Sequence, residues 1–179
     1  MTTPWPEKVW LTGEDLVLRD WIEDDIALMP GLFDNAAVAR FTPLPSPFHA
    51  AEAQAHYDKG VVRRAQGVGL RLAITDDGGE PLGEAVLFVP EEGAGPAELG
   101  YAVGPAHRGR DLAARSLRVL TAYALELGLG PLRLQIDAQN AASEAVARRA
   151  GYVPADLPPT TKVEKGLEIT LLTWEHAGS

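Results

Sequence analysis

One stretch of the sequence, residues 97–127, constrains the fold more than any other. Apolar residues alternate with other residues along 97–103, which is the pattern of a β-strand that buries one face. Gly104 and Pro105 end that pattern, and over 112–127 apolar residues recur every three or four positions, as on one face of an α-helix. The sequence therefore predicts a strand, a short loop and a helix in direct succession.

The loop between this strand and this helix carries Arg108, Gly109 and Arg110. The first amides of a helix have no partner within the helix, and the helix dipole adds partial positive charge there. Two arginines beside a helix start therefore predict a site for an anion such as a pyrophosphate. An ordinary turn with solvated arginines explains the same residues, so the loop alone leaves both interpretations open.

Residues 108–113, Arg-Gly-Arg-Asp-Leu-Ala, resemble the acyl-CoA pyrophosphate loop of the GNAT superfamily of N-acetyltransferases. That loop has Arg or Gln, two residues, Gly, one residue, then Gly or Ala. Residues 140–143 and 150–152 resemble the second motif of the superfamily, in the form seen in RimL-type protein N-terminal acetyltransferases. The resemblance implies acetyl-CoA as co-substrate. It places on that molecule Tyr101, Ala102, Val103, Arg108, Gly109, Arg110, Asp111, Leu112, Ala113, Asn140 and Ser143.

Asp111 departs from the family pattern, because it stands where the family has its first glycine. Glycine lets the backbone approach phosphate oxygens and tolerates left-handed dihedral angles. Aspartate is the next most tolerant residue and a favoured N-cap, so we expect the Asp111 carboxylate to turn back onto the helix amides. A carboxylate that faced the phosphates would instead weaken binding by like-charge repulsion.

The length of 179 residues suits one domain, 1–179, since one hydrophobic core serves about 100–200 residues. We expect a mixed α/β (α+β) fold, with a twisted, mostly antiparallel sheet of about six to seven strands and helices on both faces. The GNAT resemblance implies that the fourth and fifth strands, ending near Val103 and Ala138, splay apart. Strands are predicted at 10–19, with a turn at 13–15, and at 68–75, 82–89, 97–103, 132–138, from 151 and at 166–174. Helices are predicted at 20–34, where Pro30 and Gly31 should distort or break the helix, and at 50–66, 112–127 and 143–150, with irregular chain at 154–163.

The segment 37–49 holds a proline-rich loop, 41–48, with three prolines and two phenylalanines, Phe41 and Phe48, which cannot be continuous helix or central strand. By resemblance it lies over the acceptor side of the site. A rigid connector whose phenylalanines fill the core explains it equally well. On the following helix, 50–66, we expect His56 at the surface and Val61 and Val62 on the apolar face.

Composition excludes several classes of protein. A net charge of −9 and a pI near 4.9 argue against nucleic-acid binding, which requires a basic surface. No apolar run approaches the roughly 20 residues of a membrane span, and Met1–Pro6 does not resemble a signal peptide, so we expect a cytoplasmic protein. The absence of cysteine excludes disulfides and a thiol nucleophile, and no residues have metal-ligand spacing, so no metal is expected.

Attack of an amine on a thioester needs a neutral amine, a stabilised carbonyl oxygen and a proton for the leaving thiolate. Glu98 lies opposite in phase to the core residues of its strand, so it is a candidate base, directly or through water. A solvent-facing glutamate is the alternative. Ser143 is the candidate acid, because the tyrosine of many family members is replaced by Ala147 here. The alternative is that Ser143 serves only as a helix cap, a position for which Asn140 competes.

We therefore expect an acetyl-CoA-dependent N-acetyltransferase in which the amine attacks directly within a ternary complex. The acceptor is a protein N-terminal amine, as the RimL resemblance implies, or a small-molecule amine. The competing class is a GNAT-fold acyl-CoA-binding or regulatory protein without catalysis, which Asp111 and Ala147 favour. RimL-type proteins are often dimers, so a homodimer also stays open.

Overall fold

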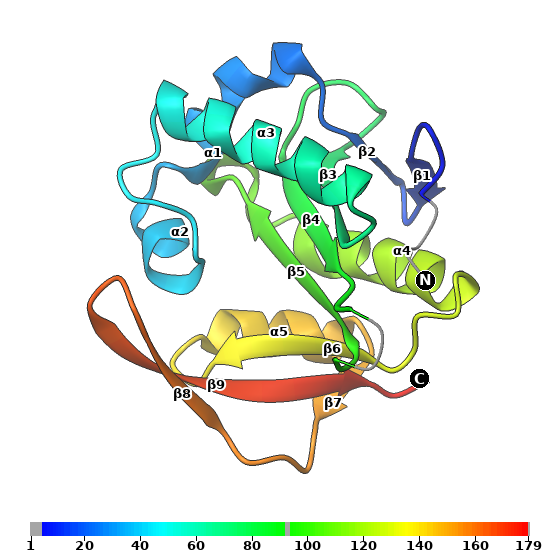
Figure 1. The fold of residues 1–179 in the computed structure, drawn as a ribbon, viewed down its shortest axis with the longest axis vertical. Coiled ribbons are helices and arrows are strands. Elements are labelled where there is room, and N and C mark those ends of the chain that lie inside the picture. Colours follow the sequence, from blue (N-terminus) through cyan, green and yellow to red (C-terminus); the bar gives the residue numbers. More distant parts are fainter. Residues whose placement is uncertain (1–4, 92–93, 179) are drawn as a thin grey trace.

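One mixed sheet organises the chain, and helices pack against both of its faces (Figure 1). The computed structural model describes residues 5–91 and 94–178. Most of the segment 1–6, which was considered above as a signal peptide, lies outside the described residues. The described strands run in the order β1-β2-β3-β4-β5-β6-β9-β7, with β8 paired to β9, and only β5 and β6 are parallel neighbours. They are β1 (Trp10–Gly13), β2 (Leu16–Asp20), β3 (Gly69–Thr75), β4 (Gly83–Phe88), β5 (Ala97–Val103), β6 (Leu132–Asp137), β7 (Tyr152–Pro154), β8 (Thr160–Glu164) and β9 (Leu167–His176).

The mixed, mostly antiparallel sheet is confirmed, but its nine strands exceed the predicted six to seven. The turn expected at 13–15 is present, since Glu14 and Asp15 both adopt φ of 54° and reverse the chain. Residues on both sides of it form strands, so 10–19 is a hairpin rather than one strand. Residues 154–163 are not wholly irregular, since β8 begins at Thr160. β8 has no buried residue, so it carries none of the alternation by which a strand is recognised.

Helices lie on both faces, as predicted (Figure 1). The predicted break in 20–34 is present, because a 3₁₀ helix ends at Leu28 and a short α-helix begins at Met29, with Pro30 in its first turn. A further helix, α2, precedes the prolines. Val61 and Val62 are about half exposed, contrary to expectation. The helices are η1 (Glu23–Leu28), α1 (Met29–Phe33), α2 (Ala36–Phe41), α3 (Ala50–Ala65), η2 (Pro105–His107), α4 (Leu112–Glu126) and α5 (Ala141–Arg149). None in the described ranges is long and apolar enough to cross a membrane.

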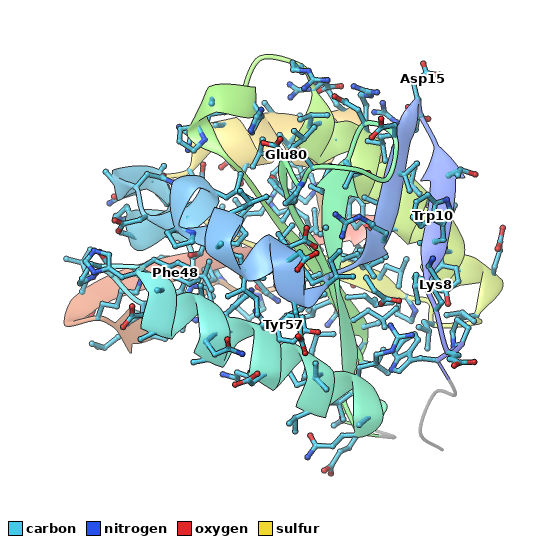
Figure 2. All side chains as sticks on the ribbon, turned by 90° about the horizontal axis from the view of Figure 1, so that it is seen from above. Lys8, Trp10, Asp15, Phe48, Tyr57 and Glu80 are labelled. Atoms are coloured by element: carbon cyan, nitrogen blue, oxygen red, sulfur yellow. The ribbon has the colours of Figure 1, made fainter. Side chains whose placement is uncertain are left out.

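Two apolar clusters hold the helices on the sheet. The larger one joins α4 to the strands through fully buried leucines such as Leu117 and Leu120. The smaller one lies beneath α3 and α1 and contains Phe33 and Phe48, the latter at the start of α3 (Figure 2). Phe48 is therefore a core residue. His56 is buried in the same layer, so its predicted surface position is wrong.

The parallel pair β5 and β6 separates soon after it begins. Only Ala97 with Leu132 and Glu98 with Arg133 are paired, although β5 continues to Val103. Beyond these pairs β5 stays with β4, and β6 stays with β9. The predicted splay between the two strands is therefore present.

The turn between β8 and β9 is attached to the α2 region. Lys165 Nζ donates hydrogen bonds to the carbonyl oxygens of Ala39 at 2.7 Å and Thr42 at 3.0 Å. Segments more than 120 positions apart in the sequence are thus joined at one side of the molecule, where Figure 1 shows the hairpin below α2.

Tyr152 provides a test of the core packing. It is 1% exposed, its hydroxyl lies 2.7 Å from Thr121 Oγ1, and burial raises its pKa to about 12. An unfolded tyrosine ionises near pH 10, so above pH 10 the unfolded state holds fewer protons than the native state. This contribution to the free energy of unfolding is therefore present below pH 10 and lost between pH 10 and 12.

We expect Tyr152→Phe to cost about 1 kcal/mol at pH 8 through the lost hydrogen bond. The variant should also show a shallower fall in stability above pH 10, because it carries no ionisable phenol there. Urea unfolding of both proteins from pH 8 to 11.5 measures the difference. Parallel curves above pH 10 would contradict the assignment.

Candidate active site

A cavity of about 660 Å³ lies where the loop after β5 meets α4 and α5. Its wall includes the start of α4, whose first amides have no partner within the helix. Arg108 and Gly109 come from the loop, and Arg149 comes from the last turn of α5. The arrangement gives one end of the cavity partial and full positive charge, which suits an anion.

Asp111 has the left-handed backbone expected at this position, with φ of 55°. Its carboxylate makes no capping hydrogen bond to α4, so the predicted N-cap is wrong. Instead Arg149 Nε donates to Asp111 Oδ1 at 2.9 Å, and Arg118 lies 4.0 Å from the other oxygen. The two guanidinium groups offset the charge that would repel a phosphate, because each lies within a few ångströms of the carboxylate.

The two arginines of the loop take different directions. Arg108 lines the cavity, and its Nη2 lies 3.4 Å from Asn35 Oδ1. Arg110 is paired with Asp76 at 2.5 Å and is not part of the cavity wall. Gly109 has φ of 79°, and a side chain there would meet open space, so the glycine serves the backbone conformation.

A second cavity, of about 360 Å³, lies on the other side of the splay. Its wall is formed by β4, β5, β6, α2, the proline-rich loop and the β8–β9 hairpin. Four carboxylates line it, Glu84, Glu98, Asp137 and Glu164. Three of them are paired with nearby cationic or histidine side chains, whereas Glu98 has no ion pair within the described residues.

The two cavities share Tyr101, Asn140 and Ser143, together with Phe41 and Thr42. Asn140 Oδ1 accepts a hydrogen bond from the Ser143 amide at 3.1 Å, so Asn140 is the cap of α5. The Ser143 hydroxyl is then available to Tyr101, whose hydroxyl donates to Ser143 Oγ at 2.9 Å. Burial raises the pKa of Tyr101, while the Ser143 hydrogen bond and the charge of Arg149 oppose that rise.

Most of the site residues predicted from the sequence are gathered at these two cavities. Arg149 and Glu84 line these cavities but were not predicted. The only sequence signal for Arg149 is a basic residue in a last helical turn, and the position of Glu84 at the cavity depends on the register between strands. The first cavity is lined by Tyr101, Val103, Arg108, Gly109, Asp111, Leu112, Ala113, Asn140 and Ser143, and the second by Glu98, Tyr101, Ala102, Asn140 and Ser143. Among residues 5–91 and 94–178 no group of side chains could hold a metal ion.

Comparisons with known proteins agree with this geometry. A family model for the acetyltransferase (GNAT) domain matches residues 15–153. The chain therefore belongs to the GNAT family of N-acetyltransferases. No curated protein matches the sequence.

Solved structures with a similar fold include RimL, a ribosomal L7/L12 alpha-N-protein acetyltransferase, with a TM-score of 0.80, 19% identity and 94% of each chain covered. RimJ of Mycobacterium smegmatis, in complex with CoA-disulfide, has a TM-score of 0.79 and 19% identity over 98% of this chain and 90% of that one. Spermidine N-acetyltransferase of Vibrio cholerae, in complex with CoA and spermine, has a TM-score of 0.75 and 16% identity over 91% and 95%. The resemblance to RimJ and RimL is thus confirmed at the level of the fold.

The Tyr101–Ser143 contact can be tested by titration. We expect Tyr101 to ionise above pH 10 because it is buried. Ser143→Ala should raise the Tyr101 pKa further, because it removes a hydrogen bond that lowers it. Titration of ¹³Cζ-labelled tyrosine by NMR follows all four tyrosines of the chain, and Tyr101→Phe assigns the signal. An unchanged or lowered Tyr101 pKa in Ser143→Ala would contradict the contact.

Proposed function

We propose that the protein transfers the acetyl group of acetyl-CoA to a primary amine, which is a protein N-terminal amine or a small-molecule amine. The main support is that two cavities meet within the splay, at Tyr101, Asn140 and Ser143. One cavity has an anion-binding end, and the other has an unpaired carboxylate, Glu98, on its wall. Two substrates can therefore approach one point from opposite sides, which direct transfer without an acyl-enzyme requires.

The helix start of α4 is the proposed place of the diphosphate. The amides of Leu112 and Ala113, with Arg108 beside them, would donate to the phosphate oxygens, and Arg149 offsets the charge of Asp111. The relatives from M. smegmatis and V. cholerae were solved with a CoA compound or CoA, which supports this assignment. Arg110 contributes only through its backbone in this arrangement, since its side chain is paired with Asp76.

Acetyl-CoA supplies an activated acetyl thioester, and side chains of this protein manage the protons. Glu98 takes a proton from the incoming ammonium through water. Beyond Glu98, the edge of β5 that faces β6 has no strand partner among the described residues. Backbone amides on that edge near Tyr101–Val103 can therefore stabilise the carbonyl oxygen of the thioester. As the C–N bond forms and the C–S bond breaks, Ser143 gives its proton to sulfur and receives one from the Tyr101 hydroxyl.

The competing class, a protein that binds acyl-CoA without catalysis, drew its support from Asp111 and Ala147. The negative charge of Asp111 is offset by Arg149. Ala147 is fully buried, so a tyrosine at position 147 would not fit without rearrangement of its neighbours. A tyrosine from β5 reaches the same serine instead. Both observations favour an active enzyme.

Two measurements test the proposal. Isothermal titration with acetyl-CoA should show binding, and thiol release should follow when an amine from a panel of N-terminal peptides, polyamines and aminoglycosides is added. Binding without thiol release for any amine would support the non-catalytic class. No heat at high acetyl-CoA concentration would overturn the proposal.

Arg149→Met should weaken acetyl-CoA binding about tenfold, because Asp111 then loses its closest partner. Arg148→Met is the control, since Arg148 lies beside it on α5 but does not line the cavity, and binding should stay within twofold. In an Asp111→Gly background, which restores the family pattern, Arg149→Met should have a smaller effect. Equal effects in both backgrounds, measured by calorimetry, would exclude compensation.

A further inference from the structure

A buried ionisable cluster, His56, Arg71 and Glu84, lies between α3 and the sheet beside the second cavity, and it has no part in the function proposed so far. Glu84 on β4 and His56 on α3 are 4% and 7% exposed. His56 Nε2 lies 2.9 Å from Glu84 Oε2 and 3.1 Å from Oε1. Arg71 Nη1 lies 2.7 Å from His56 Nδ1, 2.8 Å from His56 Nε2 and 3.7 Å from Glu84 Oε1. The Glu84 carboxylate thus lies against one ring nitrogen of His56 and beside the Arg71 guanidinium.

Strand register places Glu84 at the level where the two cavities meet. Glu84 pairs with Ala102 across β4 and β5, so both side chains lie on the same face of the sheet. Ala102 follows directly after Tyr101, which both cavities share. Glu84 lines the second cavity on this face, below α3, which is seen in front of the strands in Figure 2.

Glu98 lies farther from this point than Glu84 does. Glu98 is three positions from Tyr101, which is about 10 Å along a strand that rises about 3.3 Å per residue. Glu98 is also at the closed end of the splay, where it is paired in register with Arg133. A water molecule is consequently needed between Glu98 and an amine at Tyr101, whereas Glu84 is paired in register with Ala102, one position from Tyr101.

The cluster is poorly explained by stability alone. Taking an arginine, a histidine and a carboxylate out of water is costly, and apolar residues of similar size commonly replace such groups without loss. Arg71 Nε is buried and without a hydrogen-bond partner in the described residues, and burial lowers the Arg71 pKa. An incompletely satisfied ionisable cluster on a cavity wall is typical of a functional site.

Resting on the proposed acetyl transfer, we propose that Glu84 binds the reacting amine and takes the proton that its nitrogen loses when the C–N bond forms. Two protons leave an ammonium substrate before the amide is complete. Glu98 removes the first through water, and Glu84 accepts the second as the N–H bond breaks and an O–H bond forms on the carboxylate. His56 and Arg71 are positioning residues, because they touch the Glu84 carboxylate.

Glu84→Gln keeps the volume of the side chain and removes the base. We expect kcat with the best amine of the panel to fall about 100-fold, while acetyl-CoA affinity stays within twofold. In Glu84→Gly, added formate should restore part of kcat, since it can occupy the place of the lost carboxylate. A purely structural role predicts no rescue by formate.

Asp25→Asn is the matched control, because Asp25 is a 4%-exposed carboxylate paired with Arg19 at 2.7 Å and lines neither of the two cavities. It should lower the melting temperature without changing kcat. If Glu84→Gln does not fold, Glu84→Asp keeps the charge but withdraws the carboxylate by one methylene, and kcat should fall about tenfold.

The outcomes separate the two proposals. A wild-type protein without thiol release for any amine contradicts the acetyl transfer itself. An active wild type with unchanged kcat in Glu84→Gln or Glu84→Asp overturns only the role of Glu84. Loss of activity without rescue by formate in Glu84→Gly, together with weakened acetyl-CoA binding, assigns Glu84 to structure and overturns the role as well.

Discussion

Two residue pairs, Ala97 with Leu132 and Glu98 with Arg133, join β5 to β6, and the site depends on where this pairing ends. Each strand keeps an antiparallel neighbour on its other edge, so the opening between them is held by the sheet on both sides. Backbone amides and carbonyls at such an opening need partners. The fold thus provides a row of polar backbone groups in its middle, where two cavities meet.

Charge at the site is balanced locally. The chain carries a net charge of −9, yet the proposed ligand is itself a polyanion. Carboxylates on the cavity walls are paired with nearby cationic or histidine side chains, so they add little negative field where phosphates would bind. The pairs are Asp111 with Arg149, Asp137 with Arg40, Glu84 with His56 and Arg71, and Glu164 with Lys162. Glu98 differs from them, because it has no ion pair among the described residues.

The sequence predicted the strand–loop–helix unit well, because alternation, helical spacing and glycines act locally along 97–127. The splay was implied only by the GNAT resemblance, since no local pattern shows where two strands separate. It failed for β8, where an exposed edge strand has no buried face. The predicted break near Pro30 and Gly31 is present, between Leu28 and Met29. His56 could not be placed, because a histidine on a polar helix is buried only if the sheet supplies partners such as Glu84.

The same limit applies to the site. Motif spacing found the loop at 108–113 and Ser143, but the direction of each side chain depends on residues distant in sequence. Arg110 turns to Asp76, and Asp111 turns to Arg149, 38 positions away. No local pattern encodes these partners.

The tie between Lys165 and the carbonyl groups of Ala39 and Thr42 has a consequence for the size of the acceptor. It joins the β8–β9 turn to α2, and both segments line the second cavity. The Lys165 side chain therefore fixes the distance between two walls of this cavity. If the acceptor binds between them, we expect this fixed width to favour a slender molecule or the free end of an extended polypeptide over a folded surface.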